Sequence, residues 1–321
     1  MKLLSSIFSF ETLQPGRFTC RALGLALVLV LAVEGASRVG VKRGWLQRDP
    51  QLKEHIENQT HAVSGPARPV WFLGNSTMGA GLDRGVLPPE KAARTHILIH
   101  GSASLRSSNA MLEHYLRHAS GKPEILVVFN LPSHMNRNGK GPGRTTEGVY
   151  QEIFRTGRVP DSPPLMLLQI RTQLRNALER RFLGFFSQAG AGKRAGAGGM
   201  AANDEAYYSQ VFADYQTDLG SLSELGEIGR RNGIRRVLFV VMPVTRGLKE
   251  WFDGRPDGVA YGKVVEEISR TCRASGMECW DASVVSEDAA EFKDPYHLNP
   301  SGADKFTREF LKILDSGPER W

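Results

Sequence analysis

Short apolar runs that alternate with longer amphipathic stretches constrain the fold of this chain more than any other feature of its sequence. Each run is bounded by turn-forming residues and is too short to be a typical globular helix. Where short buried strands alternate with helices, the strands form a parallel sheet that helices cover on both faces. The sequence therefore predicts an α/β fold whose strands are residues 70–73, 96–100, 125–130, 237–242 and 277–280.

The stretches between these runs have helical spacing. They predict helices over residues 109–119, 165–186, 205–232, 259–275 and 301–314. Ligands of open parallel sheets bind beyond the carboxyl ends of the strands. We therefore expect the functional residues directly after strands or in the late loops of the chain.

An N-terminal apolar segment precedes the predicted sheet. Residues 22–33 read ALGLALVLVLAV, and residues 22–37 contain one acidic side chain and no basic one. The segment is short for a membrane-spanning helix of about 20 residues, but residues 18–21 extend it, since an arginine can reach the headgroups. The sequence thus predicts a transmembrane signal anchor at 22–37 after a cytoplasmic leader at 1–21.

A cleaved signal peptide is the alternative, because a short apolar core after a basic region is also its pattern. Either interpretation exports the rest of the chain, so we expect an extracytoplasmic, periplasmic domain, held by a single membrane pass if the segment is an anchor. After a linker at 38–69, residues 70–316 form the predicted domain, with an insertion at about 136–225. The Gly- and Ala-rich residues 188–200 within the insertion predict a flexible loop.

Charge and cysteine content argue against some classes of protein. Among 321 residues, 41 Lys and Arg against 34 Asp and Glu give a net charge of +7. The sequence has no basic helix with interleaved aromatic residues, so a nucleic-acid partner is not expected. The three cysteines have no metal-ligand spacing, so no metal is expected. Cys272 and Cys279 either pair in an oxidising compartment or remain buried thiols.

A serine, Ser76, follows the first predicted strand, next to a glycine that permits a tight bend. A serine hydroxyl is a poor nucleophile until a base removes its proton, and the base is commonly a histidine that an acid orients. Asp294 and His297 supply both groups within one late loop, at a spacing that allows a hydrogen bond between them. Ser301 is the predicted N-cap of the last helix.

These two blocks resemble the SGNH/GDSL hydrolases. The first is the Gly-x-Ser at residues 74–76, and the second is the Asp-x-x-His-Leu-Asn at residues 294–299, which a terminal helix follows. The resemblance implies a flavodoxin-like three-layer α/β/α sandwich with strand order 2-1-3-4-5. It also implies that Ser76 is the nucleophile, His297 the base and Asp294 the acid that orients the base.

The resemblance further implies an oxyanion hole made of the Ser76 backbone N–H, Gly101 after the second strand and Asn130 after the third. Donors of this kind meet the charge that develops on the carbonyl oxygen. The family's usual Gly-x-Asn-Asp is absent around Asn130, so Asn136 and Asn138 are alternatives for the third donor. Asn75 stands where the family usually has Asp, which indicates a divergent branch of the kind that carries membrane anchors.

The remaining histidines are expected to be structural or solvated. Two of them, His100 and His134, lie near predicted strand ends, where they could line the pocket.

The sequence predicts a membrane-anchored serine esterase. Its expected substrates are O-acyl esters, chiefly acetyl esters, of envelope or extracellular carbohydrate, or another small ester, cleaved through an acyl-serine intermediate. Two alternatives remain: an O-acyltransferase of the same fold, and a non-catalytic anchored subunit of a polysaccharide assembly system. Triad chemistry requires no cofactor, so none is expected.

Overall fold

The computed structural model describes residues 18–43, 57–58, 60–101, 103–138, 209, 212, 214–255 and 259–316. The predicted helix at 165–186 and the Gly- and Ala-rich residues 188–200 lie outside the described residues, as do most of the leader and part of the linker. The chain divides into two compact units, one made of residues 1–52 and 160–190 and the other of residues 53–159 and 191–321. Each unit is described by itself.

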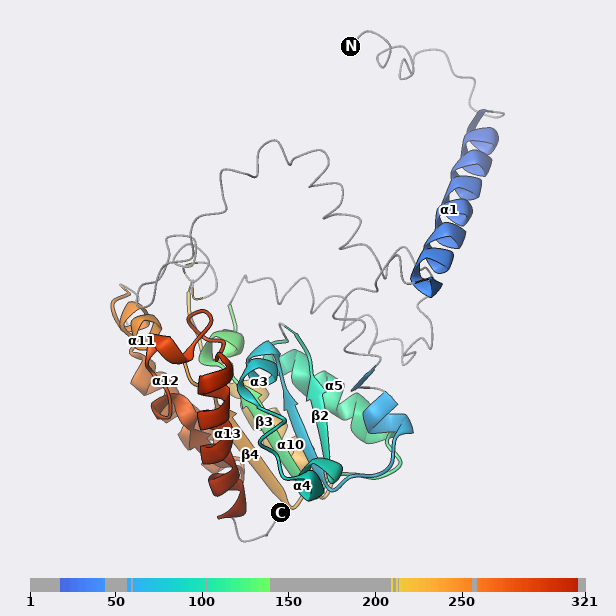
Figure 1. The fold of residues 1–321 in the computed structure, drawn as a ribbon. Helices are drawn as coiled ribbons and strands as arrows, with labels where there is room; N and C mark the ends of the chain where they lie inside the picture. The colour runs from blue at the N-terminus through green and yellow to red at the C-terminus, as the bar shows by residue number, and fades with distance from the viewer. Residues whose placement is uncertain are drawn as a thin grey trace. The chain divides into compact units, whose positions relative to one another are not determined.

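The larger unit contains a parallel five-stranded sheet in the order β2-β1-β3-β4-β5 (Figure 1). This order is the one that the SGNH/GDSL resemblance implies, and the α/β fold class is confirmed. The strands begin and end within two residues of their predicted positions. They are β1 (Val70–Gly74), β2 (Thr95–Ile99), β3 (Ile125–Asn130), β4 (Arg236–Val241) and β5 (Glu278–Asp281).

Helices cover both faces of this sheet (Figure 1). On one face lie α5 (Leu105–His118), α10 (Leu219–Arg231) and α12 (Tyr261–Ala274). On the other lie α3 (Ser76–Gly81) and α13 (Pro300–Asp315), which pack against each other, while α4 (Pro89–Ala93) lies beside β2. The remaining elements are α11 (Arg246–Asp253) and the short turns η1 (Thr60–Ser64), η2 (Pro132–Met135), η5 (Ala282–Val284) and η6 (Ala289–Glu291).

Capping side chains set helix boundaries that periodicity alone misplaced. The predicted helix at 109–119 begins earlier, at Leu105, because the Ser104 side chain accepts a hydrogen bond from Ser107 N. The predicted helix at 205–232 is wrong for residues 214–218, which are not helical, because the Asp218 side chain caps α10 at this point. The short helix α11 was not predicted.

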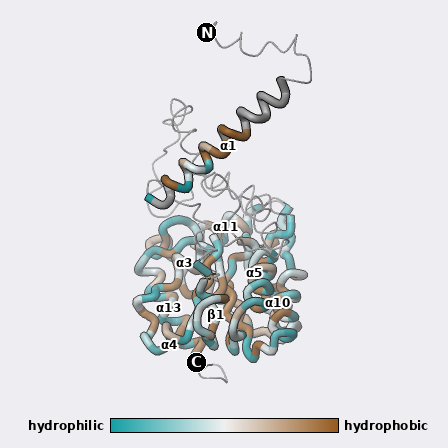
Figure 2. The backbone as a smooth tube through the Cα atoms, turned by 90° about the vertical axis from the view of Figure 1, so that its right-hand side faces the viewer, coloured by the Kyte–Doolittle hydropathy of each residue, from teal (hydrophilic) through white to brown (hydrophobic). Residues whose placement is uncertain are grey.

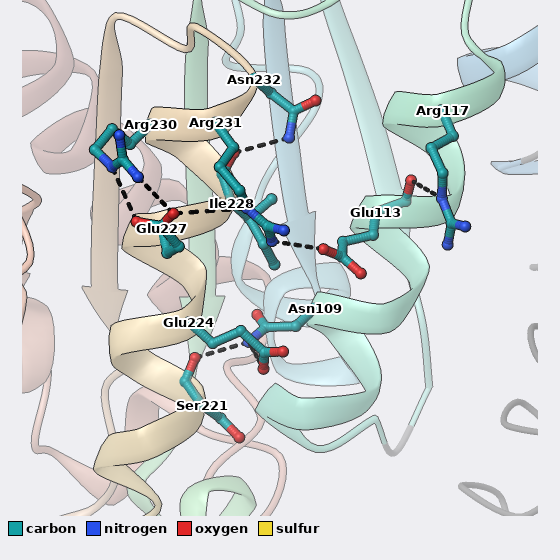
Figure 3. Close-up of polar contacts among 10 residues, drawn as sticks. All are labelled: Asn109, Glu113, Arg117, Ser221, Glu224, Glu227, Ile228, Arg230, Arg231 and Asn232. Carbon is teal, nitrogen blue, oxygen red and sulfur yellow. Dashed lines mark hydrogen bonds and ion pairs between the residues drawn. The ribbon is translucent and has the colours of Figure 1, made fainter.

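Buried and exposed polar contacts join α5 to α10 (Figure 3). The Nδ2 of Asn109 donates to the carbonyl of Ser221 at 2.7 Å and to Glu224 Oε2 at 3.0 Å. Nearer the surface, Arg231 Nη2 donates to Glu113 Oε1 at 2.7 Å. Exposed ion pairs contribute little to stability. The buried hydrogen bonds of Asn109 therefore matter more for the alignment of the two helices.

Aromatic side chains fill the space between the sheet and α13. Phe72 and Phe129 from the sheet make edge contacts with Phe310, at ring-centroid distances of 5.3 and 5.1 Å. Trp280 on β5 stacks on Phe306 at 5.6 Å. Such pairs add to the hydrophobic stabilisation of the layer that carries the late loop.

A buried arginine joins β4, β5 and α13. Arg236 is 4% exposed, and its guanidinium donates two hydrogen bonds of 2.8 Å to the carboxylate of Glu278. It also donates to the carbonyl of Leu314 at 2.8 Å, near the end of α13. A bidentate pair of this kind fixes geometry as well as charge.

The two described cysteines are free thiols, Cys272 on α12 and Cys279 on β5. A hydrogen bond between them raises the pKa of Cys272 and lowers that of Cys279. The structure thus contains the thiol pair, rather than the disulfide that the sequence also allowed.

The smaller unit contains the helix α1 (Phe18–Lys42), which includes the predicted anchor segment 22–37. Leu27, Val28 and Leu31 on this helix are exposed, and Figure 2 shows hydrophobic positions along it. Glu34 and Arg38 form an ion pair of 2.7 Å one turn apart. No helix in the described part of the chain combines the length and the apolarity that a membrane crossing requires.

Candidate active site

Ser76 is the first residue of α3 and lies directly beyond the end of β1. Asn75 caps this helix, since its Oδ1 accepts hydrogen bonds from the N and Oγ1 of Thr77 at 3.0 and 2.6 Å. At Gly74, an added Cβ would lie 2.7 Å from the Cβ of Met78. A glycine is therefore needed for α3 to turn tightly against the strand.

His297 lies in a short closed loop between η6 and α13. An antiparallel bridge joins Phe292 to Leu298 at the base of the loop. Within it, Lys293 N donates to the His297 carbonyl at 2.7 Å. Leu298 is buried beneath the loop, so the imidazole is held by both backbone pairing and packing.

The N-cap of α13 is Asn299, and the prediction of Ser301 is wrong. The Asn299 Oδ1 accepts from Ser301 N at 3.0 Å and Gly302 N at 3.1 Å. Pro300 occupies the first helical position, where its missing N–H costs nothing. An added Cβ at Gly302 would collide with the carbonyl of Glu291, so a glycine lets the helix start close to the loop.

The structure brings the three predicted triad residues together. The Ser76 Oγ lies 2.9 Å from His297 Nε2, and His297 Nδ1 lies 2.8 Å from Asp294 Oδ2. The other carboxylate oxygen of Asp294 accepts from the backbone N–H groups of Tyr296 and His297 at 3.1 and 2.9 Å. Since a carboxylate only accepts, Nδ1 carries the proton and Nε2 presents its lone pair to the serine hydroxyl.

The surroundings of Asp294 keep its carboxylate ionised. Partial burial raises the pKa of Asp294, but hydrogen bonds from the His297 side chain and from the backbone outweigh it, so the pKa lies below its usual value. The Asp294 side chain is 42% exposed and that of His297 is 21% exposed. The Tyr296 ring packs 4.4 Å from the His297 ring, centroid to centroid, which limits rotation of the imidazole.

The expected oxyanion donors share one edge of the sheet with Ser76. Gly74 is in register with Ile99 on β2 and with Phe129 on β3, so Gly101, like Ser76, comes two residues beyond this level, and Asn130 comes one residue beyond it. The Asn130 Oδ1 accepts from Leu131 N at 2.8 Å. Its Nδ2 therefore remains a donor, with no hydrogen-bond partner among the described residues.

The two alternative asparagines are engaged in the loop after η2. Asn136 Oδ1 accepts from Asn138 N and from Gln216 N, both at 3.1 Å. Asn138 Nδ2 donates to the Asp214 carbonyl at 3.0 Å. These contacts tie the loop to the segment before α10, so Asn130 is the better placed of the three to act as a donor.

One contact in the site was not foreseen. The Asn75 Nδ2 lies 2.7 Å from His134 Nδ1, so a histidine of η2 contacts the residue next to Ser76. The sequence signal for this contact was weak. His134 lies only a few residues after the third strand, but no motif surrounds it. Burial lowers the pKa of His134 to about 4, and the nearby charge of His297 acts in the same direction.

The other described histidines that are buried serve the packing of the domain. His100 is fully buried, stacks on Tyr115 at 5.8 Å and bonds with Asn58 Nδ2 at 3.2 Å. His96 bonds to the Pro66 carbonyl at 3.0 Å. The structural interpretation of His100 is therefore the better one.

Within the described ranges, no group of three His, Cys, Asp or Glu side chains is arranged to hold a metal ion. The site instead combines a serine hydroxyl, a histidine whose Nε2 faces that hydroxyl, an ionised carboxylate and an asparagine amide donor at one edge of the sheet. This is the set of groups that acyl transfer needs.

Comparison with known proteins finds remote structural likeness. No protein-family model matches the sequence, and no curated protein matches it. A protein from Lactobacillus plantarum is 14% identical, covers 78% of this chain and 97% of its own length, and has a TM-score of 0.43. The lipase/acylhydrolase from Enterococcus faecalis is 11% identical, with 79% and 100% covered and a TM-score of 0.40.

A carbohydrate acetylesterase family member from Sinorhizobium meliloti is 10% identical, with 77% of this chain and 97% of that chain covered and a TM-score of 0.38. The sheet order of this chain, β2-β1-β3-β4-β5, is the order that the SGNH/GDSL resemblance implies.

Proposed function

We propose that this chain is a serine ester hydrolase that acts through an acyl-serine intermediate on Ser76. The observation that carries the proposal is the 2.9 Å contact between Ser76 Oγ and the Nε2 of His297. At this distance His297 can take the serine proton, and the bond to Asp294 supports the tautomer that this transfer needs.

In the first half-reaction, the serine Oγ attacks the ester carbonyl carbon while its proton moves to Nε2 of His297. The charge that develops on the carbonyl oxygen meets the Ser76 backbone N–H, the Gly101 N–H and the Asn130 amide. When the tetrahedral intermediate collapses, the bond to the alcohol oxygen breaks and His297 gives its proton to that alcohol. The acyl group remains on Ser76.

In the second half-reaction, His297 removes a proton from water, which attacks the acyl-serine carbon. Collapse of this intermediate releases the carboxylic acid and returns the proton to the serine oxygen. If a sugar hydroxyl attacks instead of water, the same steps transfer the acyl group to that sugar. Hydrolysis and transfer therefore differ only in the second nucleophile.

The proposed substrates are O-acyl, chiefly O-acetyl, esters of envelope or extracellular carbohydrate. The 42% exposure of Asp294 and the 21% exposure of His297 support a large substrate, because an open site can receive an ester that projects from a polymer. A tether through α1 would hold the enzyme near such a polymer. The exposed Leu27, Val28 and Leu31 support an apolar partner for that helix.

A serine-directed probe tests the proposal. A fluorophosphonate should label the wild-type chain and fail to label Ser76→Ala, because only a base-activated serine reacts rapidly. Release of acetate from an acetylated oligosaccharide then tests the substrate class, and a second, unacetylated oligosaccharide in the same reaction detects transfer. A wild-type chain that neither reacts with the probe nor cleaves an aryl acetate would favour a non-catalytic subunit.

A further inference from the structure

The contact between Asn75 and His134 has only one arrangement of protons. The Asn75 Oδ1 accepts hydrogen bonds from the backbone N and the Oγ1 of Thr77. If the amide group were flipped, its NH2 would face the backbone N–H of Thr77, and two donors would oppose each other. Its Nδ2 therefore faces His134 Nδ1 at 2.7 Å. An amide nitrogen only donates, so the histidine Nδ1 must accept.

This arrangement fixes the state of His134. With a lone pair on Nδ1, the neutral ring carries its proton on Nε2. Adding a second proton would turn Nδ1–H toward the amide N–H of Asn75, and would place a cation near His297. The contact with Asn75 keeps the ring neutral, and burial, which lowers the pKa of His134, acts in the same direction.

The Nε2–H of His134 is left without a partner among the described residues. This nitrogen is not fully buried, so solvent or a bound molecule can reach it. The ring stands against the residue before Ser76 and within electrostatic range of His297. A neutral donor thus lies beside the residue that precedes Ser76 and close to His297.

We propose that His134 is a substrate-binding residue whose Nε2–H donates a hydrogen bond to an oxygen of the bound ester, with Asn75 as the positioning residue that fixes its tautomer. The role rests on the proposed ester chemistry. It also gives a reason for Asn75, because an aspartate at this position would accept a proton from Nδ1 rather than donate to it.

Two isosteric variants separate this role from a structural one. In His134→Gln, the amide nitrogen reaches the place of Nε2 and keeps a donor, but the contact with Asn75 is lost. In His134→Asn, the amide oxygen takes the place of Nδ1 and keeps the contact with Asn75, but no donor reaches the substrate. We expect kcat/KM for an aryl acetate or an acetylated sugar to fall about 10- to 30-fold in His134→Asn and less than about threefold in His134→Gln.

The reverse order, with His134→Asn near wild type and His134→Gln impaired, would assign His134 to structure alone and overturn the proposal. Equal kcat/KM in all three proteins would overturn it as well. Comparing the two substrates locates the bond: a loss shared by both indicates the acyl oxygen, and a loss confined to the sugar ester indicates the alcohol side.

Asn75→Asp tests the positioning role and preserves the cap, since its carboxylate still accepts from Thr77. The introduced carboxylate should raise the pKa of His134, and above that pKa the neutral ring carries its proton on Nδ1 and loses the Nε2–H. KM should therefore increase as pH rises through this pKa in Asn75→Asp, and stay level in the wild-type chain. A KM that is independent of pH in both would contradict the tautomer argument.

Nuclear magnetic resonance of the imidazole nitrogens gives a readout apart from activity. The wild-type His134 should be neutral at pH 6 to 8, with the proton on Nε2. A chain whose Ser76 reacts with a fluorophosphonate but whose His134 is protonated on Nδ1 would leave the proposed function standing and remove this inference. A chain whose Ser76 does not react would remove both.

Discussion

The Oγ of Ser76 lies 2.9 Å from the Nε2 of His297, although 221 positions separate the two residues in the sequence. The serine begins the helix after the first strand and the histidine lies in the loop before the last helix, and α3 and α13 pack against each other on one face of the sheet. The packing of these two helices thus brings together groups that a base-activated serine requires.

The triad should behave as a unit in mutants. Ser76→Ala and His297→Ala should each lower kcat on an aryl acetate by at least about a thousandfold, because neither the nucleophile nor the base works alone. The double mutant should be scarcely worse than either single one. Asp294→Asn should cost less than the loss of the serine, since it spoils the tautomer without removing the nucleophile or the base.

Circular dichroism should show unchanged folding in these triad variants. Losses that add in the double mutant, or full activity in Ser76→Ala, would contradict the serine mechanism.

Stability should increase with pH between about 4 and 6.5 on account of His134. Burial lowers its pKa to about 4 from 6.5, so within this window the unfolded chain binds a proton that the folded chain does not. Acid therefore favours unfolding. Urea denaturation at about pH 4.5 and pH 7 should show a loss of about 1 to 3 kcal/mol at low pH that His134→Gln lacks.

His134→Gln is the control for other groups that titrate in this range, because these groups change the unfolding free energy equally in both proteins. An identical pH dependence in wild type and variant would mean that His134 is solvated and has an ordinary pKa.

Arg236 should contribute more to stability than its neighbour Arg235. Arg236→Met removes the bidentate bonds to Glu278 and the bond to the Leu314 carbonyl, and should cost about 2 to 4 kcal/mol of unfolding free energy. Arg235→Met is the matched control, since its side chain is 56% exposed and its ion pair with Glu124 lies at the surface. It should change stability by less than about 0.5 kcal/mol. Equal effects would show that the hydrogen bonds of Arg236 merely offset the desolvation of its buried guanidinium.

The N-terminal segment should attach the chain to the membrane. A reporter fused after Trp321 should be active outside the cytoplasm and sediment with membranes, because residues 22–33 are continuously apolar. Removal of residues 1–42 should release the domain in soluble form. A reporter active only in the cytoplasm would remove the proposed compartment and, with it, the envelope substrate. A soluble, shortened extracytoplasmic product would indicate a cleaved signal peptide.

The sequence by itself determined the strands and their parallel arrangement. Residues 125–129 are apolar throughout because β3 is buried on both faces, and this pattern is local, so it can be read without knowledge of the fold. The pair Asp294 and His297 was also within reach, because three positions in one loop allow a hydrogen bond whatever surrounds them.

The tertiary structure decided everything that depends on which distant segments meet. The side chains of Asp218 and Asn299 cap α10 and α13 and set where these helices begin. Hydrophobic periodicity alone does not locate these starts to within one turn. Likewise, the contact of Asn75 with His134 joins residues 59 positions apart, through the pairing of β1 with β3. Local sequence fixes backbone preference, but the proton carried by a half-buried histidine depends on the partner that packing places against it, and no local pattern encodes that partner.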